Sequence, residues 1–472
     1  MVFSSSLFLL YFLPAFLILY YLSPRILKNY VALLASIFFY AWGAPDFIFI
    51  VLGSIVVDFY LVKSMHQSTG TKKKVLTGLS IVLNIGMLLY FKYANFFVEN
   101  IDAVLSIFNI QPISWTRIAL PIGISFFSFQ KMTYAVDVYR GVHKPLKSVS
   151  DLALYILMFP QLIAGPIVRF NEVADQLEDR RNNENVDNRI TGFFRFSLGL
   201  AKKVLIANPL GAYADSVFSA DATFLSTPVL WIGILAYAFQ IYYDFAGYSD
   251  MAIGLGRMIG FDFVENFNNP YISQNISEFW RRWHMSLGRW MRDYLYIPLG
   301  GSKVSQRRMY FNLWLVFLIS GFWHGAAWNF VVWGAFHGLF LIADRLFLLR
   351  FYSAIGKFPS VVITFIITLV GWVLFRSTTM TQVWDFTAGM FSFRGGDSIF
   401  VSREVWITMM VAAIFGFMAY FPSFEKWQQR LFDKQHSLRT LVVLTFASAL
   451  FFILSLGAIT SSGFNPFIYF RF

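Results

Sequence analysis

The sequence predicts an all-α, polytopic integral membrane protein. Of its 472 residues, 57% are hydrophobic and only 14% are charged. Soluble domains carry about 25% charged residues, so this chain has too little polar surface to stay dissolved in water. Apolar runs that suit membrane helices recur along the whole chain. We therefore expect one membrane domain over residues 1–472, with about 11 transmembrane helices plus re-entrant and interfacial amphipathic helices.

Charge and cysteine content exclude several classes of protein. The formal net charge is +12, and the chain contains no cysteine. The basic residues lie mainly between the apolar runs, where the positive-inside bias and anionic headgroups explain them. We therefore expect contact with membrane lipid and no binding to nucleic acid. Without cysteine, the chain can form no disulfide, no Cys-based metal site and no Cys nucleophile.

The predicted spans follow the apolar runs. The run 7–22 leads into Pro24 and Arg25 rather than a cleavage site, which predicts a retained anchor. The runs 118–130 and 310–323 are short for a span and are expected to be re-entrant or buried. The other runs cover 30–44, 47–62, 75–91, 152–168, 193–208, 228–248, 328–349, 360–375, 405–421 and 440–456.

The first loops predict the orientation of the chain. Arg25 and Lys28 flank the first loop, and Lys63 with the three lysines at 72–74 flanks the third. The second loop, around Asp46, lacks basic residues. Because cytoplasmic loops carry the excess of Lys and Arg, we expect the first and third loops in the cytoplasm and the N-terminus outside.

Three of the six histidines are candidates for chemistry. The others, His66, His143 and His436, lie in charged loops and are expected to be solvated. His284 lies in the segment Glu278 to Tyr294, which separates into an apolar and a polar face when placed on a helix. This pattern predicts an amphipathic helix at the membrane interface or over a cavity.

The spacing places His284 at the margin of the apolar face, where a buried ring needs a partner. From spacing alone, a histidine that ties the helix to a neighbour by one hydrogen bond is favoured over a catalytic one. His324 lies between two apolar runs, in the sequence Ser320 to Gly325. An ionisable residue at membrane depth marks a functional site by default, and a neutral histidine there suits general-base activation of a hydroxyl.

Glycines surround the last two candidate histidines. Gly321 and Gly325 flank the Trp323-His324 pair, where they would let the backbone bend or a substrate approach, or would serve helix packing. Gly334 and Gly338 are spaced four residues apart around His337, as on a packing face. A structural role is therefore favoured for His337.

Two carboxylates, Asp244 and Asp250, lie near the end of the run 228–248. Six residues separate them, which places them on opposite faces of a helix and argues against an acid/base dyad. We expect Asp244 to be buried and partnered by an arginine or a histidine. No metal-binding pattern and no GxSxG nucleophile elbow occur, so we expect no metal site and no covalent serine.

Dense motifs fill the region from about residue 239 to 338. They comprise 244–254, 266–268 with Pro270-Tyr271, 280–296, 298–301 and Trp323-His324-Gly325. Weaker matches cover 121–126 and 159–167. Together these motifs resemble the membrane-bound O-acyltransferase (MBOAT) family, and within it the alginate O-acetyltransferase-like branch that acetylates exported polysaccharides.

The resemblance implies a curved helical wall around a tunnel through the membrane. His324 matches the catalytic histidine of the family, and His284 matches the second polar residue that faces it. Arg281, Arg282, Arg289 and Arg292 would attract either the phosphates of an acyl donor or anionic lipid. The candidates for substrate or donor binding are Trp280, Arg281, Arg282, Trp283, Trp323 and Asp244.

The resemblance also implies an activity and its partners. Acetyl-CoA would be the cytoplasmic acyl donor, with no bound cofactor. An extracytoplasmic SGNH serine hydrolase-like acetyltransferase would receive the acetyl group, in contact with the polysaccharide synthesis and export machinery at the bacterial cytoplasmic (inner) membrane. The alternatives are D-alanyl transfer to teichoic acid, a non-enzymatic glycan transporter or flippase, and a scaffold for a polysaccharide synthase.

Overall fold

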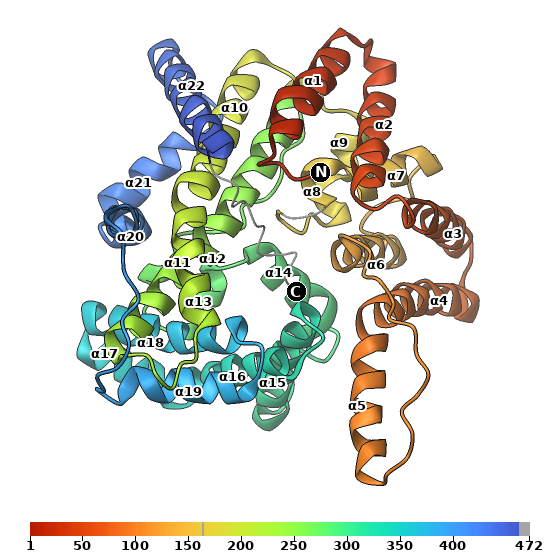
Figure 1. Cartoon of the computed structure of the whole chain (residues 1–472). Helices are drawn as coiled ribbons and strands as arrows, with labels where there is room; N and C mark the ends of the chain where they lie inside the picture. Colours follow the sequence, from red (N-terminus) through yellow and green to blue (C-terminus); the bar gives the residue numbers. More distant parts are fainter. Residues whose placement is uncertain (163–164, 462–472) are drawn as a thin grey trace. The chain divides into compact units, whose positions relative to one another are not determined.

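The structure is a computed structural model that describes residues 1–162 and 165–461 (Figure 1). Within these ranges the chain forms helices and no strand, apart from an isolated bridge between Leu225 and Asp397. The predicted all-α class is therefore confirmed. Ile163 and Ala164, which belong to the motif at 159–167, lie outside the described residues.

Eight helices of the described part are long and apolar enough to cross a membrane, and a shorter apolar stretch covers Phe8–Leu22. These helices confirm a polytopic membrane protein, while the predicted number of about 11 spans is not confirmed. Two predicted short segments belong to longer helices: α6 begins at Ile124 and continues to Arg140, and α15 covers Gln306–His324. The eight spans are Arg25–Gly43, Ile48–His66, Gly70–Ile107, Thr227–Met258, Trp328–Ile355, Lys357–Arg376, Arg403–Tyr420 and Leu438–Ser461.

The helices group into two compact units, which comprise the described residues of 1–184 with 259–263, and those of 185–258 with 264–461. The single membrane domain therefore stays a prediction. The first unit contains η1 (Phe8–Phe12), α1 (Leu13–Leu22), α2 (Arg25–Gly43), α3 (Ile48–His66), α4 (Gly70–Leu88), η2 (Leu89–Tyr93), α5 (Ala94–Ile107), α6 (Ile124–Arg140), α7 (Val149–Leu157), α8 (Phe159–Leu162), α9 (Phe170–Glu178) and η3 (Arg181–Asn183).

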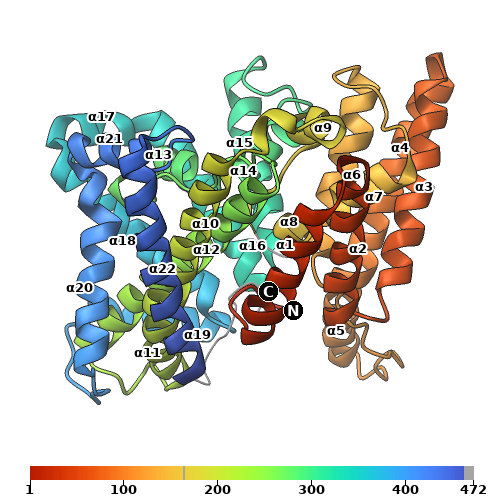
Figure 2. The ribbon, with the colours of Figure 1, turned by 90° about the horizontal axis from the view of Figure 1, so that it is seen from above.

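A buried ion pair holds α3, α4 and α6 of the first unit together; α3 and α4 run side by side in Figure 2. Lys131 Nζ lies 3.0 Å from Asp58 Oδ2, and both side chains are almost fully buried. Ser80 Oγ and Asn84 Nδ2 donate to the same carboxylate at 2.7 and 2.9 Å. A buried carboxylate is stable only when paired and hydrogen-bonded, so this cluster fixes the three helices relative to one another.

The second unit contains the motif region from about 239 to 338. Its central element is α12 (Thr227–Met258), a helix of 32 residues. At 1.5 Å per residue it extends over about 48 Å, well beyond the ~30 Å hydrocarbon thickness. The other elements are α10 (Val186–Ala201), η4 (Lys202–Ala207), α11 (Asn208–Ser219), η5 (Pro270–Ile272), α13 (Ile276–Arg282), α14 (Met285–Met291), η6 (Arg292–Tyr296), α15 (Gln306–His324), α16 (Trp328–Ala343), η7 (Asp344–Leu348), α17 (Leu349–Ile355), α18 (Lys357–Arg376), α19 (Met380–Phe391), α20 (Arg403–Phe417), η8 (Met418–Tyr420), α21 (Pro422–Leu431) and α22 (Leu438–Ser461).

Helices α10 and α12 touch through two pairs of glycines. A Cβ added at Gly199 would lie 2.5 Å from the carbonyl oxygen of Gly247, and one at Gly254 would lie 2.5 Å from that of Gly192. The lower-numbered glycine of one helix meets the higher-numbered glycine of the other, so the helices are antiparallel. Small residues let helix backbones approach closely in membranes, and here no side chain fits between them.

Charged side chains flank this contact. Lys203 Nζ lies 3.0 Å from Asp244 Oδ1, and Lys202 Nζ lies 2.6 Å from Asp250 Oδ2. Both lysines belong to η4, a π-helical segment that continues α10. The predicted arginine or histidine partner of Asp244 is therefore wrong: the partner is a lysine on another helix, 41 positions earlier in the chain, which spacing within α12 could not reveal.

We expect Gly199→Ala to lower the stability of the protein by about 1–3 kcal/mol, because overpacking against backbone forces the two helices apart. Gly86→Ala is the matched control, since Gly86 lies in α4 with no atom within 4 Å of the added Cβ. Alanine forms helices better than glycine, so Gly86→Ala should leave the stability of the protein unchanged or raise it slightly. Thermal unfolding of both variants in detergent tests this expectation. Equal melting temperatures for Gly199→Ala and Gly86→Ala would contradict the close glycine contact.

Candidate active site

The predicted single helix over 278–294 is wrong, because the chain breaks between α13 and α14. His284 has the left-handed conformation, with φ 46° and ψ 51°. The backbone on either side of it pairs with the segment that precedes η5. Asn268 N–H donates to the Arg282 carbonyl, and Met285 N–H donates to the Asn266 carbonyl, both at 2.9 Å. These tertiary hydrogen bonds replace the helical ones that the amphipathic pattern predicts.

Asn266 holds the side chain of His284. Its Oδ1 lies 3.0 Å from His284 Nδ1 and also accepts from the N–H and the hydroxyl of Ser286, at 3.3 and 2.8 Å. Because this oxygen is an acceptor, the hydrogen of the neutral imidazole lies on Nδ1 and Nε2 is the basic atom. Asn266 Nδ2 donates to Ser249 Oγ on α12 at 3.0 Å, so α12 orients the amide that orients the histidine.

His284 is neutral and strained. It lies outside the candidate membrane spans and is only 1% exposed. Burial lowers the pKa of His284 to about 3, because desolvation disfavours the charged imidazolium. A left-handed backbone costs a residue other than glycine about 1–3 kcal/mol, and such strain concentrates at functional sites. The hydrogen bond expected for a buried His284 is present.

His324 ends α15 close to His284. The two ring centroids lie 6.3 Å apart, and the interplanar angle is 57°. Trp333 and Phe375 meet the His324 ring edge to face, at centroid distances of 5.2 and 5.4 Å. His324 is 8% exposed. The structure thus brings the two predicted catalytic histidines together among buried aromatic side chains.

His337 is buried one layer behind this pair. Its ring centroid lies 5.0 Å from those of Trp280 and Trp333. A Cβ at Gly371 would lie 2.8 Å from His337 Nε2, so α18 must carry a glycine there. The contacts agree with the structural role favoured for His337.

Glycines also bring α15 and α16 together. A Cβ at Gly321 would lie 2.3 Å from the Phe330 carbonyl oxygen, and one at Gly334 would lie 2.4 Å from that of Phe317. The packing interpretation of these two glycines is confirmed. Their close contact fixes His324, at the end of α15, beside Trp333 of α16.

The other predicted site residues have different surroundings. Trp323 is buried beside both histidines, with centroid distances of 6.4 Å to His284 and 4.9 Å to His324. Trp280 contacts His337, and the ring of Trp283 lies 4.8 Å from that of Trp372 on α18. Asp244 is fully buried in its ion pair with Lys203 and is therefore committed to the α10–α12 contact.

Two of the arginines that were predicted to bind the donor already form ion pairs with carboxylates. Arg282 pairs with Glu278 at 2.9 Å and approaches Glu425 at 3.4 Å, while Arg292 pairs with its neighbour Asp293 at 2.7 Å. Arg281 is exposed. Among the residues that the structure describes, no group of three or more His, Asp or Glu side chains could hold a metal ion.

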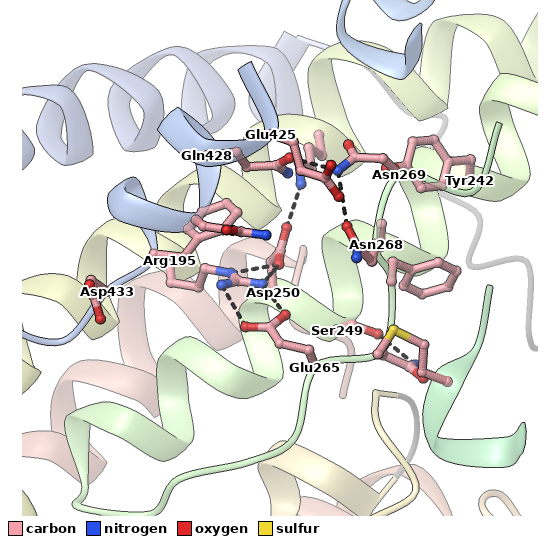
Figure 3. A pocket seen from close by; sticks show the side chains of 17 residues that line it. Arg195, Tyr242, Ser249, Asp250, Glu265, Asn268, Asn269, Glu425, Gln428 and Asp433 are labelled. Atoms are coloured by element: carbon pink, nitrogen blue, oxygen red, sulfur yellow. Dashed lines mark hydrogen bonds and ion pairs between the residues drawn. The ribbon is translucent and has the colours of Figure 1, made fainter. Parts of the chain in front are cut away.

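A polar cavity of about 340 Å³ adjoins this site, and Asn266 and Met285 belong to its lining. One wall is an ion network of buried Arg195, which pairs with Asp250 at 2.6 Å and with Glu265 at 2.7 Å (Figure 3). Because Glu265 directly precedes Asn266, this network anchors the segment that orients His284. The segment 266–268 is one of the motifs in the sequence, but its function as a support was not predicted.

We expect acid to destabilise the protein through His284. Its pKa is about 3 when folded and near 6.5 when unfolded, so the unfolded state binds the extra proton and stability falls as the pH drops below 6.5. At pH 5 the loss should be about 2 kcal/mol. The titratable ring that faces His284 is His324. The contribution of His284 is isolated by measuring the melting temperature against pH for wild type and for His284→Gln. Identical slopes for the two proteins would contradict the burial of His284 in its neutral form.

Comparison with known proteins gives a consistent result. The family model of the membrane-bound O-acyltransferase family matches residues 141–380. A probable alginate O-acetylase AlgI of Azotobacter vinelandii is 46% identical, over 83% of this chain and 78% of that protein. A peptidoglycan O-acetyltransferase of Helicobacter pylori is 36% identical, over 86% and 82% respectively.

A more distant relative, a teichoic acid D-alanyltransferase of Bacillus subtilis, is 30% identical over 48% of this chain and 59% of its own length. The residues that the family model matches include both histidines of the pair. The chain therefore belongs to the membrane-bound O-acyltransferase family and is an acyltransferase of the bacterial O-acetylase type.

Proposed function

We propose that the chain moves an acetyl group from cytoplasmic acetyl-CoA toward hydroxyl groups of an exported polysaccharide such as alginate. The observation that carries this proposal is the buried His284–His324 pair, whose ring centroids lie 6.3 Å apart. Two of the relatives are named for O-acetyl transfer, one to alginate and one to peptidoglycan.

In the proposed reaction, His324 acts as the general base. It takes the proton of an acceptor hydroxyl while the hydroxyl oxygen attacks the thioester carbonyl. The carbon–sulfur bond then breaks, and the leaving thiolate receives that proton from His324, so the products are an O-acetyl ester and free coenzyme A. General-base assistance contributes about 10²–10⁴-fold to such reactions. An acyl-histidine intermediate is the alternative course.

His284 orients the reacting groups. Its Nδ1–H is committed to Asn266, so it interacts with a substrate or with the neighbouring histidine through Nε2, as a hydrogen-bond acceptor. A fixed acceptor beside the base favours one orientation of the hydroxyl, and correct orientation is worth several powers of ten in rate. The aromatic walls around His324 keep water from competing with the acceptor.

We further propose that the acceptor belongs to an extracytoplasmic SGNH serine hydrolase-like acetyltransferase, which passes the acetyl group to the polymer. The chain would then work in the bacterial cytoplasmic membrane beside the polysaccharide synthesis and export machinery, with its N-terminus outside. A curved wall around a tunnel would let a cytoplasmic donor and an outer acceptor reach one buried pair.

The test supplies radiolabelled acetyl-CoA to membranes that contain the chain and its partner, and follows label into protein and glycan. We expect transfer by wild type, a loss of about 10²–10⁴-fold in His324→Ala, and a clear loss in His284→Ala. His66→Ala, which removes an exposed histidine of α3, is the matched control. Equal labelling by wild type and His324→Ala would remove His324 from the mechanism.

The same assay distinguishes the alternatives. Label from D-alanine in place of acetyl would support transfer to teichoic acid, although the relative with that name aligns with only about half of this chain. Loss of polymer export in His324→Ala, with acetylation per molecule unchanged, would support a transporter or flippase. A variant without transfer that still assembles the complex would separate the enzyme from a scaffold.

A second prediction concerns the support of His284. Asn266→Leu removes the acceptor of His284 Nδ1–H, so we expect kcat to fall about 10²-fold through misorientation. Ser286→Ala removes one hydrogen bond to the same amide but leaves the His284 contact in place. We expect it to cost less than tenfold. Equal effects of the two substitutions would show that the amide supports α14 in general rather than His284.

A further inference from the structure

The histidine pair offers hydrogen-bond acceptors to a substrate but no donor for the oxygen of an acyl carbonyl. The ring hydrogen of neutral His284 lies on Nδ1 and is donated to Asn266, so its other nitrogen, Nε2, is an acceptor. His324 accepts a proton in the proposed reaction. When a hydroxyl attacks a thioester, the carbonyl oxygen gains negative charge, and donors that meet this charge are usually the largest single contribution to catalysis. A third group must therefore supply the donor.

Trp333 of α16 carries a suitable donor beside the pair. Its ring meets the His324 ring edge to face, with the centroids 5.2 Å apart and an interplanar angle of 87°. The side chain is 1% exposed, and within residues 1–162 and 165–461 its Nε1 has no hydrogen-bond partner. Burial of an N–H group without a partner is unfavourable. Such a group in a native structure needs an explanation, and a catalytic function is one.

The contact with His324 distinguishes Trp333 from its neighbour Trp280. Nε1 of Trp280 also lacks a partner in the described part of the chain. The ring of Trp280, however, contacts His337 and Trp333, at centroid distances of 5.0 and 5.4 Å, and neither histidine of the pair. Of these two indoles, Trp333 is therefore the one within reach of a group that reacts at His324.

Close helix packing holds Trp333 in this position. The next residue, Gly334, lies against α15, where an added Cβ would come within 2.4 Å of the Phe317 carbonyl oxygen. Because α15 carries His324 and α16 carries Trp333, this contact fixes the indole relative to the base. On α18, Phe375 packs against the same indole at a centroid distance of 5.1 Å. A donor that is held in advance needs no reorganisation during the reaction, as electrostatic stabilisation requires.

We propose that Trp333 is a further catalytic residue, whose Nε1–H donates to the acyl carbonyl oxygen as this oxygen gains negative charge. The inference rests on the proposed acyl transfer at His324. As the hydroxyl oxygen bonds to the carbonyl carbon, the π electrons of the C=O bond move to its oxygen, and His324 takes the hydroxyl proton. The electron pair then returns and re-forms the C=O bond, the carbon–sulfur bond breaks, and the leaving thiolate receives the proton from His324. Trp333 keeps its hydrogen throughout.

The experiment removes the N–H group and keeps the shape of the ring. In the full chain, Trp333 is replaced with 3-benzothienylalanine, in which sulfur takes the place of the indole N–H, and Trp333→Phe serves as a second variant. With radiolabelled acetyl-CoA and the partner present, we expect kcat to fall about 10²–10³-fold in both proteins, while KM stays within about threefold. Because the N–H group has no partner within the protein, the benzothienyl replacement should leave the melting temperature unchanged or raise it.

Trp231 of α12 is the matched control, because its Nε1–H donates to the Met390 carbonyl at 2.7 Å. The same replacement at Trp231 should lower the melting temperature and leave kcat unchanged. A kcat within about threefold of wild type after replacement of Trp333 would overturn the proposal. A fall in melting temperature as large as that at Trp231 would also overturn it, because the indole would then make a structural hydrogen bond.

The outcome also separates this inference from the proposed acetyl transfer. If wild type transfers no acetyl group, the proposed function is wrong, and the comparison is repeated with a radiolabelled D-alanyl thioester. The expectation for Trp333 is the same there, because every acyl thioester has a carbonyl oxygen. A loss confined to KM would show that the indole binds the ground state, which overturns the proposal. Transfer of neither group by wild type would overturn both.

Discussion

The close contact between α10 and α12 is the constraint on which the rest of the second unit depends. With the backbones touching at two glycine pairs, the side chains beside the contact have no room except against the opposite helix. Those side chains are charged, and a charge at membrane depth is tolerated only with a partner. Asp244 and Asp250 on α12 therefore meet Lys203 and Lys202 on η4.

From this contact, a sequence of bonds leads to His284. Arg195 on α10 binds Asp250 and also Glu265, which fixes the start of the segment that carries Asn266. Ser249, the residue before Asp250, accepts from the amide of Asn266. The left-handed backbone of His284 costs about 1–3 kcal/mol, and the hydrogen bonds from the segment 266–268 offset it. Helix packing some distance from the histidines thus determines the orientation of one of them.

The sequence predicted the all-α membrane class and the residues of the histidine pair, because hydrophobic composition and short motifs are local signals. The break at His284 was not predictable in the same way, since it depends on hydrogen bonds to Asn268 and Asn266, which precede His284 by 16 and 18 positions. The Lys203 partner of Asp244 was missed for the same reason. One feature of the sequence could have predicted the contact between α10 and α12: the glycines of each helix are seven residues apart, at 192 and 199 and again at 247 and 254.

Ion pairs compensate the charge of several basic side chains near the histidine pair. The basic side chains of the cavity lining and two of the nearby arginines are paired with carboxylates, and burial keeps His284 uncharged because it lowers the pKa of that ring to about 3. In a low-dielectric site, an unpaired cation would bind stray anions and would disfavour protonation of a neighbouring imidazole. With these cations paired, they oppose protonation of His324 less in the proposed reaction. Aromatic side chains and ion pairs therefore both shape the surroundings of the pair: the rings of Trp333 and Phe375 contact His324, and the ion pairs hold the basic side chains against carboxylates.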